Sequence, residues 1–266
     1  MLKTTRPSNR AGSVLRSLFP QSAAFALIVV AGCFATAEAV RVSFAADEVT
    51  PAVKTPEWKP LFDGKTLKNW KSAEFGGEGE VTVKEGMIVM QQGSEMTGVT
   101  WTGGDLPKIN YEISLMAQRI DGSDFFCGLT FPIKELPCSF IVGGWGGGVV
   151  GISSLDGLDA ANNETSRYES FQKGRWYKIR MRVTEQGLMG WIDEQQVVGV
   201  ETKGRKISIR HEVELSRPLG ISCYSTVSGL KDIKIRELTK AEADAAIKAP
   251  ELPKDEESKP SKKDAK

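Results

Sequence analysis

Residues 176–183 read WYKIRMRV, and this stretch decides the fold class. Apolar and basic residues alternate strictly along it, the apolar ones being Tyr177, Ile179, Met181 and Val183. Side chains alternate across a β-strand, so the pattern predicts a strand with one buried and one solvated face. We expect Lys178, Arg180 and Arg182 to form a solvated sheet face, with an anionic-sugar site as the alternative interpretation.

The same period of two recurs on both sides of this stretch. Residues 111–118 place Tyr111, Ile113, Leu115 and Ala117 on one face. Other predicted strands are 81–84, 87–91, 99–102, 125–131, 139–142, 149–152, 188–192, 197–201, 219–224 and 232–236. Turn signals separate them at Glu85-Gly86, Asp121-Gly122, Asp193-Glu194 and Arg217-Pro218. Many short strands without a long amphipathic helix predict an all-β sandwich or barrel, and of these we expect a two-sheet antiparallel sandwich.

Both ends of the 266-residue chain are predicted to lie outside this fold. Residues 1–39 combine a basic start, a short apolar run at 23–34 and two small-x-small cleavage patterns, which is typical of a secretory signal peptide. We therefore expect an exported protein (periplasmic, cell-surface or extracellular) without a transmembrane segment once the signal is removed. Residues 30–33 resemble a lipobox, so a lipid anchor on Cys33 is the alternative, and a retained membrane helix is a further one.

Composition divides the rest into a linker at 40–57, the sandwich domain at 58–240 and a charged tail at 241–266. The tail has almost no large apolar residue, so we expect it to be disordered, with at most a frayed helical turn at 241–247. The formal net charge is +1, with acids and bases interspersed. Nucleic-acid binding would need a concentrated basic face, and we expect none.

Three cysteines follow the signal segment, namely Cys127, Cys138 and Cys223. An odd number argues against a disulfide framework, so we interpret them as small core residues, with a Cys127–Cys138 bridge as the alternative. The chain has one histidine, His211, and no CxxC pair, so no structural zinc site is expected. His211 stands between charged residues and is expected at the surface.

The string LFDGKTLKNW at residues 61–70 resembles the opening motif of the 3-keto-disaccharide hydrolase domain family. Further segments fit the same family in order: residues 81–88, 174–177, 190–193, 218–221 and 231–238. The resemblance implies a secreted jelly-roll sandwich of the concanavalin-like, laminin-G-like type across residues 58–238. We interpret the opening motif as structural, with Asp63-Gly64 making a tight turn and Trp70 closing one end of the sandwich.

The resemblance also implies cleavage of disaccharides that carry a ketone at position 3 of one sugar. A neighbouring ketone acidifies the adjacent C–H bond, so cleavage can proceed by elimination and addition of water, given a general base and a general acid. Typical members carry a Tyr-Glu strand and a later His-Gly, but residues 138–145 and 221–226 here hold neither a carboxylate nor a histidine. A non-catalytic carbohydrate-binding module and a surface structural or interaction sandwich therefore stay open as alternatives.

The candidate site lies mainly in residues 143–169. Trp145 is flanked by glycines, and two interpretations stay open: packing in the core beside a glycine bulge, and an exposed indole on which a sugar ring can stack. The candidate catalytic residues are Asp156, Asp159, Glu164 and Glu169. The candidate substrate-binding residues are Trp145, Asp124, Asn162, Asn163, Arg167 and Tyr168. No cofactor and no metal ligand is assigned; the clustered oxygens would suit calcium, although their spacing matches no EF-hand, and a solvated loop is the other interpretation.

Overall fold

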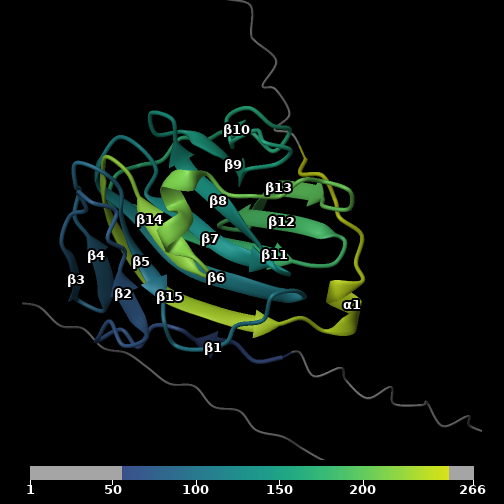
Figure 1. The fold of residues 1–266 in the computed structure, drawn as a ribbon, viewed down its shortest axis with the longest axis horizontal. Helices are drawn as coiled ribbons and strands as arrows, with labels where there is room; N and C mark the ends of the chain where they lie inside the picture. Colours follow the sequence, from purple (N-terminus) through teal and green to yellow (C-terminus); the bar gives the residue numbers. More distant parts are fainter. Residues whose placement is uncertain (1–55, 252–266) are drawn as a thin grey trace, which may run out of the picture. The chain divides into compact units, whose positions relative to one another are not determined.

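Two antiparallel sheets dominate residues 56–251, the part of the chain that this computed structural model describes (Figure 1). The predicted signal peptide at 1–39, Cys33, most of the linker at 40–57 and the end of the tail lie outside the described residues. No helix among residues 56–251 is long and apolar enough to cross a membrane.

The first sheet has eight strands and is built around two long ones that pair along most of their length. Its order is β13 (Gln195–Glu201), β12 (Gly187–Ile192), β11 (Tyr177–Val183), β6 (Tyr111–Gly122), β15 (Thr226–Glu237), β4 (Met87–Met90) and β3 (Val81–Lys84), with β1 (Lys59–Pro60) beside the end of β15. The predicted turn between β3 and β4 is present: Glu85 and Gly86 both have positive φ, as a two-residue hairpin turn with the twist of the strands requires.

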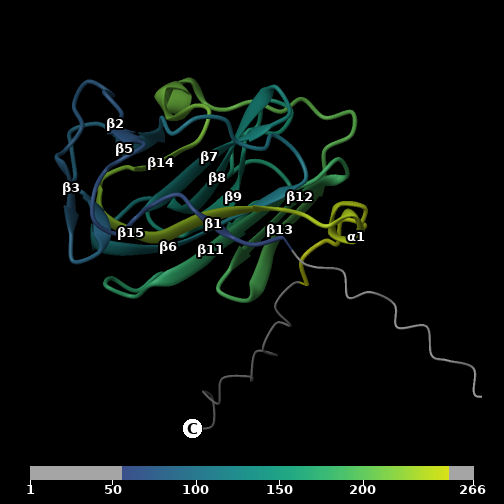
Figure 2. The same ribbon diagram turned by 90° about the horizontal axis from the view of Figure 1, so that it is seen from below.

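The second sheet has seven strands. Its order is β10 (Arg167–Tyr168), β9 (Val149–Ser153), β8 (Leu136–Gly144), β7 (Cys127–Ile133), β14 (Gly220–Cys223), β5 (Thr97–Trp101) and β2 (Trp70–Ser72). A short 3₁₀-helix, η1 (His211–Ser216), lies on the outer side of this layer, while β6 and β15 belong to the opposite layer (Figure 2).

The core lies between the two sheets and is made of the side chains that point inward from their strands. Among its largest fully buried members are Tyr111, Leu115, Phe140 and Ile179. Trp70 is buried, donates from Nε1 to the carbonyl oxygen of Leu61 at 2.9 Å and packs edge-on against Trp101. This arrangement confirms the predicted antiparallel jelly-roll sandwich of the concanavalin-like type.

Several strand boundaries differ from the sequence prediction. β6 continues through the predicted turn at Asp121-Gly122, because β15 begins at Thr226, earlier than expected, and pairs with it there. β1, β2 and β10 were not predicted, since two or three residues are too few to show alternation. All three cysteines are buried and free, which confirms the core interpretation; Cys127 stands opposite Val142 rather than Cys138.

Arg180 and Arg182, expected on a solvated face, are instead largely buried, and this corrects the sequence interpretation for them. The side chain of Lys178 is half exposed and pairs with the exposed Glu194, as expected of a solvated face. The carboxylate of Glu112 is 1 % exposed and accepts hydrogen bonds from Arg180 and Arg182, each at 2.8 Å, and from Arg236 at 2.8 Å and 2.5 Å. The ring of Trp191 covers the guanidinium of Arg180 at 3.8 Å. The alternating arginines of β11 therefore belong to a buried ionic network, because the neighbouring strand β6 supplies the carboxylate with which they pair.

The first residues of the tail are those for which the sequence allowed a helical turn within a segment expected to be disordered. A helical turn, α1 (Lys240–Ala243), starts with a capping box between Thr239 and Glu242. Beyond it the chain runs past β13, where Gln196 donates to the carbonyl oxygen of Lys248 at 2.7 Å. Contacts with a sheet edge thus order residues 241–251, even though their composition offers little to bury.

Candidate functional site

The outer face of the seven-stranded sheet carries short side chains. One cross-strand row runs through Thr130, Ser139 and Ser153, and the hydroxyls of the first two lie 2.9 Å apart. The next row is formed by Gly98, Ser222, Gly128, Ile141 and Gly151. Such side chains cover little of the sheet, so the main chain comes close to this surface and leaves room above it.

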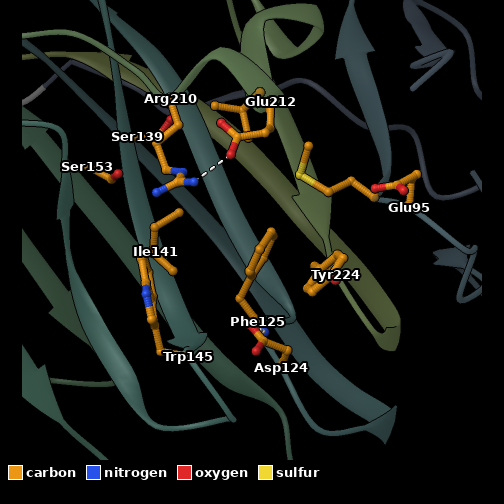
Figure 3. A pocket seen from close by; sticks show the side chains of 12 residues that line it. Glu95, Asp124, Phe125, Ser139, Ile141, Trp145, Ser153, Arg210, Glu212 and Tyr224 are labelled. Atoms are coloured by element: carbon orange, nitrogen blue, oxygen red, sulfur yellow. Dashed lines mark hydrogen bonds and ion pairs between the residues drawn. The ribbon is translucent and has the colours of Figure 1, made fainter. Parts of the chain in front are cut away.

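A groove of about 390 Å³ lies over this floor (Figure 3). Ser139, Ile141 and Ser153 line its bottom, and the remaining lining residues come from the surrounding loops and η1. These are Glu95, Met96, Asp124, Phe125, Trp145, Arg210, Glu212, Val213 and Tyr224. The volume falls within the usual range for small-ligand sites, and the mixture of aromatic, hydroxyl and ionic groups suits a polyhydroxylated ligand.

Aromatic side chains form one end of the groove. Trp145 is 40 % exposed and Tyr224 is 41 % exposed, while the rings of Phe125 and Tyr224 stack with their centroids 6.2 Å apart. Figure 3 shows Trp145 and Asp124 at this end and Arg210 and Glu212 at the other. Of the two interpretations of Trp145, packing in the core is therefore excluded, since the indole lies at the surface and lines the groove.

Asp124 fixes the loop that carries Trp145. Its two carboxylate oxygens accept from the main-chain N–H of Phe125 at 2.7 Å and of Gly146 at 2.8 Å. Trp145 itself has a φ of 47°, a left-handed conformation that is strained for a residue with a bulky side chain. Because both oxygens of Asp124 are occupied, this carboxylate acts on the shape of the loop rather than as a free base.

An ion pair forms the other end of the groove. Arg210 donates from one terminal nitrogen to Glu212 at 2.5 Å and from the other to Asp159 at 3.3 Å. The hydrogen bond from Arg210 lowers the pKa of Glu212 below its ordinary value and raises the pKa of Arg210. Near neutral pH the groove therefore holds a carboxylate beside a guanidinium.

The predicted acidic residues do not converge on one site. Asp156 and Glu164 both pair with Arg205, at 2.6 Å and 2.5 Å. A backbone hydrogen bond from Lys206, followed by the bond from Arg205, lowers the pKa of Asp156, and the bond from Arg205 also lowers the pKa of Glu164. Asp159 reaches the groove only through Arg210, so the acidic loop borders the site instead of lining it.

The two predicted asparagines lie in different environments. Asn163 is buried and holds its loop together, donating to Ile152, Leu158 and Asp159 and accepting from Thr165, whereas Asn162 is exposed and donates to Asp159.

Glu169 lines a second, separate pocket of about 330 Å³ with Arg175 and Tyr177. Arg167 donates to main-chain oxygens of Pro250 and Glu251, and Tyr168 is 74 % exposed. Trp145 and Asp124 are thus the predicted residues that the structure brings together in the groove.

Sequence reasoning missed most of the groove. Glu212 and Val213 come from η1, a six-residue segment without a periodic pattern, and Arg210 directly precedes it. The side chain of His211, between Arg210 and Glu212, is 97 % exposed, as expected. Among residues 56–251, no three or more histidine, cysteine or acidic side chains come together closely enough to hold a metal ion. The oxygens considered for calcium face Arg205 and Arg210 instead of one another.

Several solved structures are similar to this chain. One is a putative glycosyl hydrolase from Parabacteroides distasonis, at 12 % identity and a TM-score of 0.42, over 68 % of this chain and 94 % of that one. A second is the carbohydrate-binding module CBM66 from Bacillus subtilis, at 9 % identity and a TM-score of 0.42, over 64 % and 96 % of the two chains. A third is domain 4 of the GH43 arabinanase AbnA from Geobacillus stearothermophilus in complex with arabinotriose, at 10 % identity and a TM-score of 0.45, over 71 % and 96 %.

Sequence comparisons identify a family but no individual curated relative. No curated protein sequence matches this chain. The family model of the 3-keto-alpha-glucoside-1,2-lyase-like domain matches residues 57–236, which is nearly the whole sandwich and contains the entire groove.

Proposed function

Because this chain belongs to the family of 3-keto-α-glucoside-1,2-lyase-like domains, as the resemblance of residues 61–70 predicted, we propose that it binds a 3-keto-glycoside in the groove and cleaves it by elimination. The observation that carries the proposal is the groove itself, with an exposed indole at one end and the Arg210–Glu212 pair at the other. The described part of the chain holds this combination on the outer face of one sheet.

Trp145 supports the binding half of the proposal. An exposed aromatic face attracts the apolar C–H face of a sugar ring, and the polar edge of the indole can donate to a hydroxyl. The hydroxyls of Ser139 and Ser153 on the floor are short donors and acceptors that a sugar can reach without displacing a large side chain. We infer that one sugar of the ligand stacks on Trp145 and the other lies toward Arg210.

Glu212 and Arg210 support the chemical half. A carboxylate can take the proton from carbon 2, next to the ketone at carbon 3, and a guanidinium can stabilise the negative charge that develops on the ketone oxygen. The electron pair of the C–H bond then forms the double bond between carbons 1 and 2 while the bond from carbon 1 to the glycosidic oxygen breaks. The departing alkoxide takes up a proton, so the products are an alcohol and an unsaturated 3-keto sugar, to which water can add.

Sugar binding and cleavage are tested separately. Purified protein is incubated with a 3-keto-disaccharide, and the release of free sugar and the ultraviolet absorbance of the conjugated enone are recorded. We expect Glu212→Gln to abolish release while binding persists, and Trp145→Ala to weaken binding. Glu214→Gln is the matched control, since Glu214 lies on the same short helix but outside the groove and pairs with Arg217. Unchanged release from Glu212→Gln would refute the assignment of the base.

Binding without catalysis is the second candidate, and a specific observation favours it. Both carboxylate oxygens of Asp124 accept hydrogen bonds from main-chain N–H groups, and Glu212 is paired with Arg210. Neither carboxylate is therefore free of protein partners, as a general acid or base would be. The two segments in which typical family members carry a glutamate and a histidine supply Ser139, Ile141, Trp145 and Tyr224 to this groove. An unoxidised disaccharide bound with equal affinity, and no cleavage of the oxidised one, would support this candidate.

A further inference from the structure

Arg119 lies inside the sandwich, at a position where the alternation of β6 predicts an apolar side chain. Tyr111, Ile113, Leu115 and Ala117 precede it at the same phase, and all of them are buried. Arg119 is only 5 % exposed. A charged residue continuing the inward phase of a strand needs a specific set of partners, because burying an unpaired charge is costly.

The partners of Arg119 are main-chain carbonyl oxygens of two loops. Its guanidinium donates to Asp124 at 3.0 Å and 3.2 Å, to Gly143 at 3.1 Å and to Gly147 at 2.9 Å. It also lies 5.3 Å from the centre of the Phe126 ring. Burial lowers the pKa of Arg119, and these oxygens and this ring replace the water that the charge has lost. The guanidinium therefore joins the loop of Asp124 to the loop of Trp145.

Two glycines make room for this arrangement. A Cβ atom on Gly143 would lie 2.6 Å from a terminal nitrogen of Arg119, and one on Gly147 would lie 2.8 Å from the carbonyl oxygen of Ser123. Both glycines also have positive φ, which a side chain would disfavour. The glycines around Trp145 thus allow the main chain to approach the buried guanidinium of Arg119 closely, in addition to leaving the indole exposed.

We propose that Arg119 is a positioning residue that fixes Trp145 as a sugar platform by holding the loop on either side of it. Arg119 does not line the groove, so it acts on a ligand only through this loop and through Asp124. The part of the proposal that concerns sugar affinity rests on the proposed function. The part that concerns the loop does not, and the two are measured separately.

The first measurement is amide hydrogen exchange in Arg119→Lys. A lysine keeps the charge but cannot reach three carbonyl oxygens with the fork of a guanidinium. We expect the amides of Gly147 and Gly148, which both donate to the carbonyl oxygen of Gly144 at 3.1 Å, to exchange about tenfold faster, since local opening is governed by the bonds that close it. Arg180→Lys on the outer face of the other sheet is the matched control. Unchanged exchange at Gly147 and Gly148 would overturn the proposal.

The second measurement is a double-mutant cycle on the affinity for a disaccharide. If Arg119 acts through Trp145, Arg119→Lys weakens binding about tenfold in the wild-type background and has little effect in the Trp145→Ala background. Equal losses in both backgrounds would contradict this route. A wild-type protein that binds no sugar would refute the proposed function, while the exchange measurement would still decide the role of Arg119. Should Arg119→Lys fail to fold, Gly143→Ala places a Cβ 2.6 Å from a terminal nitrogen of Arg119, so it disturbs the same guanidinium and is expected to speed exchange at Gly148.

Discussion

The two outer faces of the sandwich differ in the length of their side chains. On the seven-stranded sheet, cross-strand rows of glycine, serine and threonine leave space for a groove. On the eight-stranded sheet, long basic side chains lie against tryptophan rings: Arg180 is 3.8 Å from the ring centre of Trp191, and Lys231 is 4.2 Å from that of Trp176. Long side chains cover a sheet with their own aliphatic and aromatic surface.

This difference shows that a high density of charge does not by itself mark a functional face. The carboxylate of Glu112 collects three guanidiniums and leaves them little capacity for a ligand, so the charged face stabilises the fold. The face of small residues contributes less to stability and provides the groove. The following predictions test this division of roles, beginning with the largest expected effect.

Glu112→Gln should destabilise the fold most. It removes the anion shared by Arg180, Arg182 and Arg236, and breaking a buried ion pair by removing one partner costs about 3–5 kcal/mol. Urea unfolding measures the loss. The control is Glu135→Gln, whose partner Lys108 is exposed, with an expected change of about 0.5 kcal/mol or less. A loss from Glu112→Gln as small as that of the control would refute a structural role for the charged face.

Ile141→Trp should affect ligand binding more than stability. Ile141 lines the groove and also packs with Val149 and Ala160, so part of a larger side chain would extend into the open space of the groove. We expect affinity for a disaccharide to fall about 100-fold, which is ~2.7 kcal/mol, in a titration by calorimetry. Met116→Trp is the matched enlargement on the outer face of the eight-stranded sheet and should change affinity little. If both substitutions weakened binding equally, the ligand would not be confined to the groove.

Asn163→Ala should show that the acidic loop contributes to stability and not to sugar binding. Asn163 is buried and its amide makes five hydrogen bonds to neighbouring residues, so removing it leaves buried polar groups unpaired at a cost of about 2 kcal/mol. Thermal and urea unfolding should show this loss, while sugar affinity per folded molecule stays constant. Asn162→Ala, which removes an exposed amide, should do neither. A selective loss of affinity in Asn163→Ala would restore this residue as a ligand-binding group.

The sequence predicted the sandwich well, because strand alternation is a local property. β11 and β6 were predicted from the inward phase shared by Tyr177 and Ile179 in one strand and by Ile113 and Leu115 in the other, and both are buried as expected. β10 pairs through only two residues, so its existence depends on β9 and cannot be read from its own sequence. Pairing between distant segments decides such elements, and a single sequence does not reveal it.

The site was predicted only in part, for the same reason. Trp145 carried a local signal, since glycines flank it, and it lines the groove. Glu212 carried none, because its environment depends on η1 packing on β14 and on β5, and β5 is distant from η1 in sequence. Arg119 did carry a signal that was overlooked, a charged residue at the inward phase of β6. Departures from a pattern were thus more informative about the site than the clusters of acids.

The smallest expected effect concerns pH and the link between the charged face and α1. Hydrogen bonds from Arg236 lower the pKa of Glu242 to about 2, against an ordinary value of 4.5, and Arg182 also lies 3.3 Å from its carboxylate. A lowered pKa means that the carboxylate stabilises the fold fully above about pH 4.5 and loses this effect as the pH falls toward about 2. Since the pair is partly exposed, Glu242→Gln should cost about 1 kcal/mol near neutral pH.

The difference in unfolding free energy between Glu242→Gln and the wild type should therefore shrink steadily between about pH 4.5 and pH 2, as unfolding titrations at several pH values can show. The variant keeps the side-chain oxygen that caps Thr239, so helix capping does not account for the difference. Sugar affinity should be the same in both proteins throughout, because Glu242 in α1 pairs with the eight-stranded sheet, whereas the groove lies on the seven-stranded sheet. A change in affinity that followed the titration of Glu242 would mean that the two faces are coupled, contrary to the division of roles argued from their side chains.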